Sequence, residues 1–197
     1  MPRRRSTYRS LASLERDLAG CRACVEAGHP LESLPVLAPM HGQRAYLFGQ
    51  APGIQEGVER RPWRGRAGQT LRRWLELDED TFYATFYCAS VTRCYPGRAA
   101  SGRGDRAPSP REQDLCAGAP TRSRRHRGPA RGETARRLLG ITQLTEAIGE
   151  RLELEGVPVV PLPHPSGASS WPNVPANRAR LDRALQLVHA GLASPAA

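Results

Sequence analysis

The stretch AYLFGQAPG, residues 45–53, decides the fold of this 197-residue chain. A short apolar run breaks into Gln-Ala-Pro-Gly, a pattern that predicts a buried strand feeding a tight loop. Two more strands are predicted at 81–91 (TFYATFYCASV) and at 157–163 (VPVVPLP). Because helical patterns separate these strands, we predict a parallel α/β sheet with functional loops at the carboxyl ends of its strands.

Helices are predicted where apolar residues recur at helical spacing beside capping signals. The stretch 7–19 ends at Gly20, and 108–116 carries Ser109 as a plausible N-cap with Glu112 three residues later. Further helices are predicted at 67–77, 141–153 and 175–192, and an extended connector at 31–43.

The composition is that of one domain with a strong positive charge. The net charge is +10, and all 29 basic residues are arginine. Such a field favours DNA, RNA or an anionic membrane surface, although a GC-rich gene also produces a chain without lysine. No apolar run is long enough to span a membrane, and the basic start MPRRRSTYRS is not followed by an apolar segment. We therefore expect a cytoplasmic protein with no membrane partner.

Four of the five cysteines have a spacing that predicts a metal site. Cys21 and Cys24 form a CxxC, Cys94 follows in TRCYPG, and Cys116 ends PSPREQDLC. Structural zinc sites usually bring their ligands as two short-spaced pairs, so one pair plus two dispersed cysteines favours a structural 4Fe-4S cluster, with zinc as the alternative. Cys88 lies in an apolar run and is predicted to be an ordinary buried cysteine.

One stretch departs from this pattern. Residues 117–137 contain no Val, Ile, Leu, Met, Phe, Tyr or Trp, and 7 of the 21 positions are arginine. A disordered basic insertion would explain the composition, and so would a compensated frameshift in a GC-rich gene. Sequencing the locus in close relatives separates the two, since a frameshift predicts an apolar strand there in the relatives.

These motifs together resemble the uracil-DNA glycosylases, in particular their iron–sulfur-containing family 4. The resemblance rests on the CxxC, GQAPG (49–53), PWRGRAGQTL (62–71), TRCYPG (92–97) with PSPREQDLC (108–116), and PHPSG (163–167). It implies one domain over 1–197, with a three-layer α/β/α fold around a four-stranded parallel sheet. The third strand of that sheet would fall in the arginine-rich stretch 117–137.

The resemblance also implies roles for the residues of two catalytic loops. His164 would donate to a carbonyl oxygen of the base, and Gln50 would hydrogen-bond the base. Ala51, Pro52 and Gly53 would form the turn that presents backbone N–H groups to it. Family 4 has Glu at the position of Gln50, and the fastest glycosylases have Asp at that of Ala51, so no general base is identified.

Three more residues would bind the substrate. Trp63 matches the aromatic residue that stacks on the flipped base, with a core tryptophan as the alternative interpretation. Ser90 stands where the family has an Asn that reads the edge of uracil, which leaves hypoxanthine and xanthine open as substrates. Ser166 belongs to a loop that would bind phosphates. Glu56 matches an acidic residue common in the family.

The function implied is a monomeric DNA glycosylase for base excision repair. It would bind DNA containing a damaged base, most readily uracil, flip that base and hydrolyse its N-glycosidic bond. The chain has no lysine, which excludes a Schiff base formed by a lysine side chain. Two alternatives remain open: a non-catalytic DNA-binding member of the superfamily, and an inactivated member that has lost a strand at 117–137.

Overall fold

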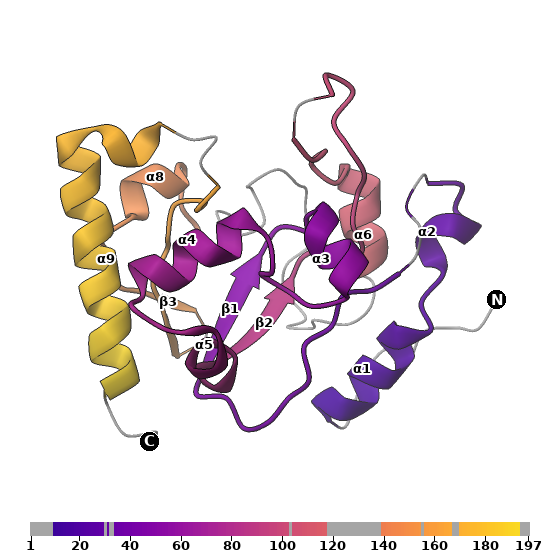
Figure 1. The fold of residues 1–197 in the computed structure, drawn as a ribbon, viewed down its shortest axis with the longest axis horizontal. Helices are drawn as coiled ribbons and strands as arrows, with labels where there is room; N and C mark the ends of the chain where they lie inside the picture. Colours follow the sequence, from indigo (N-terminus) through magenta and orange to yellow (C-terminus); the bar gives the residue numbers. More distant parts are fainter. Residues whose placement is uncertain are drawn as a thin grey trace.

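The computed structural model describes residues 10–29, 31, 34–102, 104–117, 139–154, 156–166 and 170–193. At its centre lie two parallel strands, β1 (Ala45–Gly49) and β2 (Phe86–Ser90), paired from Ala45↔Phe86 to Gly49↔Ser90 (Figure 1). The strand predicted at 45–49 is therefore confirmed. Both carboxyl ends lie at the same edge of the sheet, as the pattern of strands and helices predicts.

Three helices connect the two strands: α3 (Ile54–Glu59), α4 (Arg66–Trp74) and α5 (Glu79–Thr85). The strand predicted at 81–91 is wrong in its first half, because α5 occupies it. Asp78 caps α5 by accepting from the Thr81 backbone N–H at 2.8 Å, and two acidic residues follow in the first turn. This cap and the interaction of the acids with the helix dipole outweigh the β-branched and aromatic composition.

One face of the sheet carries the main hydrophobic core. Leu71 of α4, Leu75 directly after that helix and Phe82 of α5 pack on Phe86 and Cys88 of β2, and all five side chains are buried. The helix predicted at 67–77 thus buries the face expected of it. Cys88 is 2% exposed and belongs to this core, as its sequence context predicts.

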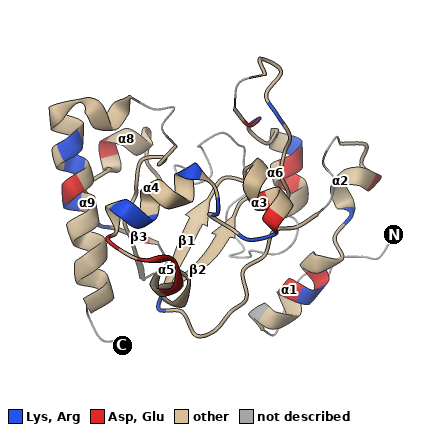
Figure 2. Cartoon of the chain, viewed as in Figure 1, with Lys and Arg blue, Asp and Glu red and all other residues tan. Residues whose placement is uncertain are grey.

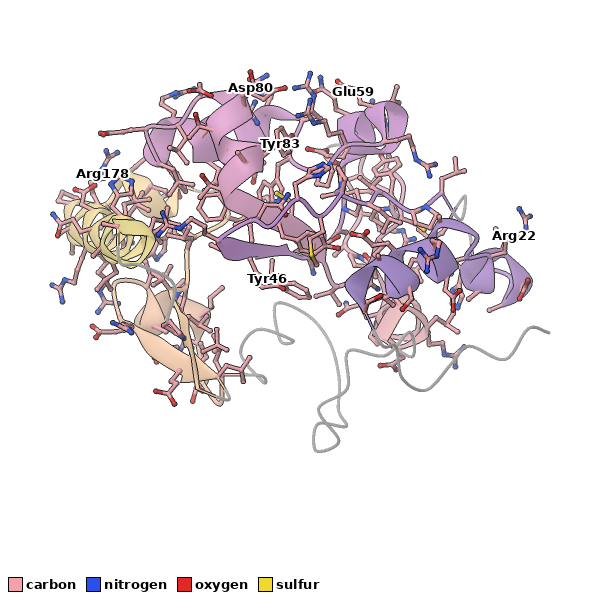
Figure 3. The ribbon with its side chains drawn as sticks, turned by 90° about the horizontal axis from the view of Figure 1, so that it is seen from below. Arg22, Tyr46, Glu59, Asp80, Tyr83 and Arg178 are labelled. Carbon is pink, nitrogen blue, oxygen red and sulfur yellow. The ribbon has the colours of Figure 1, made fainter. Side chains whose placement is uncertain are left out.

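The other face of the sheet is more open among the described residues. Tyr46 and Phe48 of β1 are 70% and 51% exposed, and Figure 3 shows Tyr46 projecting from the side opposite Tyr83. Tyr87 of β2 is buried on this face, where its hydroxyl lies 2.9 Å from Glu15 of α1 (Leu11–Ala19). The helix α1 therefore covers only part of the face.

Further helices flank the sheet on two sides (Figure 1). On one side, α2 (Ala23–Glu26) contacts α6 (Pro110–Ala117). On the other side lie α8 (Leu144–Ala147), the 3-10 helix η1 (Trp171–Asn173) and α9 (Pro175–Ala193). The helices predicted at 7–19, 108–116 and 175–192 are confirmed within the described residues.

A separate antiparallel hairpin replaces two predicted elements. It joins β3 (Leu152–Leu154) to β4 (Val157–Val159). The helix predicted at 141–153 is wrong beyond α8, because Gly149 adopts φ +92° and interrupts the helical path. The strand predicted at 157–163 reaches only to Val159 and does not join β1 and β2. Pro158 lacks an N–H to donate, which suits an edge strand.

The fold is therefore mixed α/β, with a parallel sheet of two strands among the described residues rather than the four predicted. The arginine-rich stretch 117–137 lies outside those residues, apart from Ala117 at the end of α6. Within the same ranges, no helix is both long and apolar enough to cross a membrane.

Candidate active site

The candidate site forms where β1 and β2 end. Loop 1, residues 50–53, follows β1, and the segment 90–92 follows β2. The Val91 backbone N–H donates to the Gly49 carbonyl, and the Thr92 N–H donates to the Gln50 carbonyl, each at 3.0 Å. The two exits from the sheet are thereby tied together, with the side chain of Gln50 exposed.

The carboxylate of Glu56 holds loop 1 against a second loop. Its Oε1 accepts the Gly65 backbone N–H at 2.7 Å, and the residue is 7% exposed. A Cβ added to Gly53 would lie only 2.7 Å from Glu56 Oε2, so loop 1 passes this carboxylate at a distance that only glycine permits. The sequence singles out Glu56, but the reason for its position appears only in the structure.

Asp105 links loop 1 to the loop that carries Cys94. One of its carboxylate oxygens accepts the Ile54 backbone N–H at the start of α3, at 3.4 Å. The other accepts the Tyr95 hydroxyl at 2.9 Å. Asp105 is a residue that the sequence analysis misses, since it lies 51 residues from Ile54 along the chain.

Trp63 lies directly over the end of β1. A Cβ added to Gly49 would be 3.1 Å from its ring carbon Cζ2, and the ring packs at the edge of the main core. The residue adopts φ +59°, a left-handed conformation that is unusual for a bulky side chain. Its carbonyl accepts Arg72 Nη1 at 3.0 Å. Trp63 therefore combines the partial burial of a core residue with a position beside loop 1.

Ser90 is half-buried at the end of β2. Its hydroxyl donates to the Thr92 carbonyl at 2.8 Å, so the side chain already takes part in the turn after the strand. A ligand at this edge would meet only the acceptor lone pairs of the hydroxyl.

His164 follows β4 on an exposed segment in which the flanking prolines, Pro163 and Pro165, are buried. Its Nδ1 accepts the Ser166 backbone N–H at 3.2 Å, and Ser166 Oγ lies 2.8 Å from the same nitrogen. Because Nδ1 is an acceptor, the neutral ring carries its proton on Nε2. The protein atoms around the ring partly shield it from water and so lower the pKa of His164 below its usual value, which favours this neutral form.

The structure brings loop 1, Trp63 and Ser90 together, and it places His164 and Ser166 on a different segment. Among the described residues, no hydrogen bond connects His164 with loop 1 or with Ser90. The segment does reach the main core, since Leu162 packs against it.

The family model described as the uracil DNA glycosylase superfamily matches residues 37–188 of this chain. The chain belongs to the uracil DNA glycosylase superfamily. The match covers loop 1, Trp63, Ser90 and His164. Members of this superfamily act on DNA, and membership indicates hydrolytic chemistry of the glycosylase type.

Two of the predicted metal ligands precede the superfamily match, which begins at residue 37. Cys21 lies before α2 and Cys24 within it, while Cys94 follows β2 and Cys116 lies on α6. Cys24, Cys94 and Cys116 are buried, and Cys21 is half-buried. Burial first, and then the proximity of Cys116, Cys24 and Cys21, together raise the pKa of Cys94 to about 12. Four cysteines from three segments thus converge.

The cysteines of this superfamily member form no disulfide, and all five lie among the described residues. Among the described residues, no three His, Cys, Asp or Glu side chains are placed to hold a single metal ion. A four-iron cluster binds each thiolate through a different iron, so its ligands lie farther apart than those of a single ion. The donor set, three buried cysteine sulfurs and the half-buried Cys21, fits such a cluster.

Proposed function

We propose that this protein is a DNA glycosylase that hydrolyses the N-glycosidic bond of uracil or another deaminated base in base excision repair. The observation that carries the proposal is the position of Trp63 over Gly49, beside loop 1 and at the carboxyl end of β1. A base turned out of the duplex would stack on this ring, which contributes roughly 1–3 kcal/mol per base.

The reaction separates charge, and the residues of the site suit that separation. Water adds to the sugar carbon while the base leaves as an anion that then takes up a proton, so the product is an abasic site. His164, neutral and protonated on Nε2, would donate to the base oxygen on which negative charge develops. The Gln50 amide would contact the base edge, and the Ser166 hydroxyl would bind a phosphate.

Ser90 is the residue that leaves the preferred base open. An Asn at this position offers both a donor and an acceptor to the edge of uracil, whereas Ser90 donates its only proton to Thr92. Uracil therefore loses one matched hydrogen bond in this site. Hypoxanthine and xanthine remain alternative substrates of the same chemical class.

Cys21, Cys24, Cys94 and Cys116 are the residues we expect to hold a 4Fe-4S cluster, with zinc as the less favoured occupant. The cluster would supply a covalent cross-link between the N-terminal helices, the loop after β2 and α6. We assign it a structural role, since small domains often replace part of a hydrophobic core by such a link. Cytoplasmic location and a monomeric state are expectations of the same proposal.

A second candidate function is that of a non-catalytic or inactivated iron–sulfur member that binds DNA. The replacement of acidic residues by Gln50 and Ala51 favours it, since neither side chain can activate water. The lack of a hydrogen bond between His164 and loop 1, within the described residues, favours it as well.

Base release separates the two functions. Oligonucleotides containing uracil, hypoxanthine or xanthine, single- and double-stranded, are incubated with the protein and the free base is measured. A glycosylase releases at least one base, and His164→Ala reduces the rate by roughly 100-fold or more. His41→Ala, at an exposed histidine outside the site, is the matched control and leaves the rate unchanged. Folded protein that binds these DNAs and releases nothing supports the non-catalytic function.

A further inference from the structure

Six consecutive residues, 60–65, form the loop that carries Trp63, and each of them is held by a separate contact. We call this segment the Trp63 loop. At its start, Arg60 Nη2 donates to the Pro35 carbonyl at 2.8 Å. The guanidinium of Arg61 lies 3.9 Å above the ring of Tyr83, whose hydroxyl donates to the Pro62 carbonyl at 2.5 Å. The first half of the loop is thus attached to the connector and to α5.

The second half of the Trp63 loop is attached to three helices. The Trp63 carbonyl accepts Arg72 Nη1 of α4 at 3.0 Å. Arg64 forms ion pairs with Glu59 of α3, at 2.5 Å, and with Glu79 of α5. Because Arg64 is engaged within the chain, it supports the loop rather than offering its charge to a DNA phosphate.

Glu79 is the carboxylate that these contacts share. Its Oε1 faces Arg61 at 3.2 Å and also pairs with Arg64, while its Oε2 lies 3.5 Å from Arg72 Nη2. Arg72 in turn holds the Trp63 carbonyl through its other terminal nitrogen. Figure 2 shows the acidic start of α5 beside the arginines of α4. One carboxylate therefore joins both flanks of Trp63 to the helix α4.

The conformation of Trp63 needs such support. Arg60 and Glu76 also have positive φ, but both lie at the carboxyl ends of helices, where this conformation is common. Trp63 has φ +59° in a turn, where no helix end accounts for the left-handed conformation. A strained backbone persists only where its surroundings hold it, and such strain is concentrated at functional sites.

Close packing alone does not hold the loop. A cavity of about 110 Å³ lies against Arg61 and Pro62 and is lined on its other sides by Tyr83, Phe86 and Gln43, among others. The backbone of Trp63 is confined on the opposite side by Gly68 of α4, since a Cβ there would come within 1.7 Å of the Trp63 carbonyl oxygen. The polar contacts therefore act together with this packing to fix where the loop lies.

We propose that Glu79 and Arg72 are positioning residues that hold the indole of Trp63 against Gly49 in the free protein. The stacking surface for the flipped base is then formed before DNA binds, and the base meets a ring that does not need to be ordered. The proposal deepens the proposed function, because the role of the ring as a stacking surface rests on it. The placement of the ring by Glu79 and Arg72 does not depend on the proposed function.

Glu79→Gln tests the proposal, with Asp80→Asn as the matched control. Both acids lie in the first turn of α5, so the two substitutions change the charge and the helix dipole alike. Asp80 is exposed and points outwards, as Figure 3 shows. Trp74→Phe and Trp171→Phe are introduced throughout, which leaves Trp63 as the only tryptophan.

We expect Glu79→Gln to shift the Trp63 emission to longer wavelength and to lower its anisotropy in the free protein, whereas Asp80→Asn changes neither. Single-turnover base release then falls by roughly 10-fold in Glu79→Gln, with DNA affinity unchanged. Equal emission and anisotropy in the two variants would overturn the proposal. If neither protein releases any base, the fluorescence result still decides the proposal, and only the proposed function fails.

A second pair of variants covers the case in which Glu79→Gln does not fold. Gly68→Ala raises the helix propensity of α4 and yet forces the Trp63 carbonyl to move. Gly191→Ala is the same change within α9, at a position with no atom within 4 Å of the new Cβ. Gly68→Ala should reproduce the fluorescence change, and Gly191→Ala should not. A Trp63 signal that is unaltered in Gly68→Ala contradicts the proposed arrangement.

Discussion

Ser90 shows how a single side chain sets the expected substrate. Its hydroxyl proton is committed to the Thr92 carbonyl, so the end of β2 presents an acceptor and no donor. A site built to hydrogen-bond a polar edge rejects substrates that lack the matching group. A site that has lost its own hydrogen-bonding group likewise loses its preference for the substrate that carried the partner group. We therefore expect the base preference to depend on the residue at position 90 more than on the stacking ring.

Ser90→Asn is predicted to raise uracil release relative to hypoxanthine release by roughly 10-fold or more, since the new amide supplies both a donor and an acceptor. The measurement is single-turnover release of the two bases from otherwise identical duplexes. Ser90→Ala is the control, because it also breaks the bond to Thr92 without adding an amide. An equal change in both variants would mean that the turn, and not base pairing by the side chain, controls preference.

At the same scale, sequence reasoning reaches only part of the site. The places of Gln50 and Ser90 follow from parallel strands whose carboxyl ends share one edge. The left-handed conformation of Trp63 and the three arginines around Glu79 do not follow, because they depend on side chains that meet across 7 to 18 residues of intervening chain. The catalytic roles of His164 and Gln50 stay predictions.

Among the elements, α6 is the clearest agreement between sequence and structure. The predicted capping box forms, with Glu112 Oε2 accepting the Ser109 N–H at 2.6 Å and Ser109 Oγ accepting the Glu112 N–H at 3.3 Å. Arg106 adds a bidentate pair to the same carboxylate at 2.7 and 2.8 Å. Burial alone would raise the pKa of Glu112, but the hydrogen bonds from Arg106 and Ser109 outweigh it and hold the pKa at about 2.

This carboxylate should stabilise the fold in a defined pH range. Its folded pKa of about 2 lies below the ordinary 4.5, so the stabilisation is complete above pH 4.5 and is lost as the pH falls towards 2. The shift corresponds to about 3 kcal/mol of unfolding free energy. Urea unfolding at a series of pH values should show that the free energy of unfolding falls less at acid pH for Glu112→Gln than for the wild type.

Asp114→Asn, on the exposed side of the same helix, is the comparison for that experiment. It removes one carboxylate without touching the capping box, so its acid loss should match that of the wild type. If Asp114→Asn also reduced the loss of unfolding free energy at acid pH, the effect would be due to net charge and not to the Glu112 contacts.

The elements that sequence reasoning misjudges have local causes. The aromatic composition of 81–91 predicts one strand, but the Asp78 cap starts a helix that lasts to Thr85. The apolar periodicity of 141–153 predicts one helix, but α8 ends at Ala147, where Ile148 turns to an extended conformation and Gly149 follows with φ +92°. In both cases a single capping or turn residue overrides the average of its neighbours.

Across the whole molecule, the four cysteines come from three separate segments: α2 with the residues just before it, the loop after β2, and α6. The segment with Cys21 and Cys24 precedes the superfamily match, and it meets the rest of the protein where α2 contacts α6. The core under β1 and β2 involves neither of these helices. Under the proposed function, a cluster at these cysteines would cross-link the three segments.

Protein purified without oxygen should contain about four iron and four acid-labile sulfide per chain. Cys116→Ser is predicted to lose most of both and to lower the melting temperature. Cys88→Ala is the matched control, since that cysteine lies in the main core, and it should keep its iron. Zinc in place of iron would show that the cofactor is wrong and that the four-cysteine site is right. Soluble protein without either metal would contradict the metal site.

The narrow passage of loop 1 beside Glu56 has a practical consequence for protein engineering. A library that aims to change the accepted base should hold Gly53, Gly65 and Gly68 constant, since any side chain there meets the Glu56 carboxylate or the Trp63 carbonyl. Gly20 and Gly191 have open space around them and can carry labels or surface attachments. Diversity is better directed to positions 50, 51 and 90, at the carboxyl ends of β1 and β2, where the proposed function places the base.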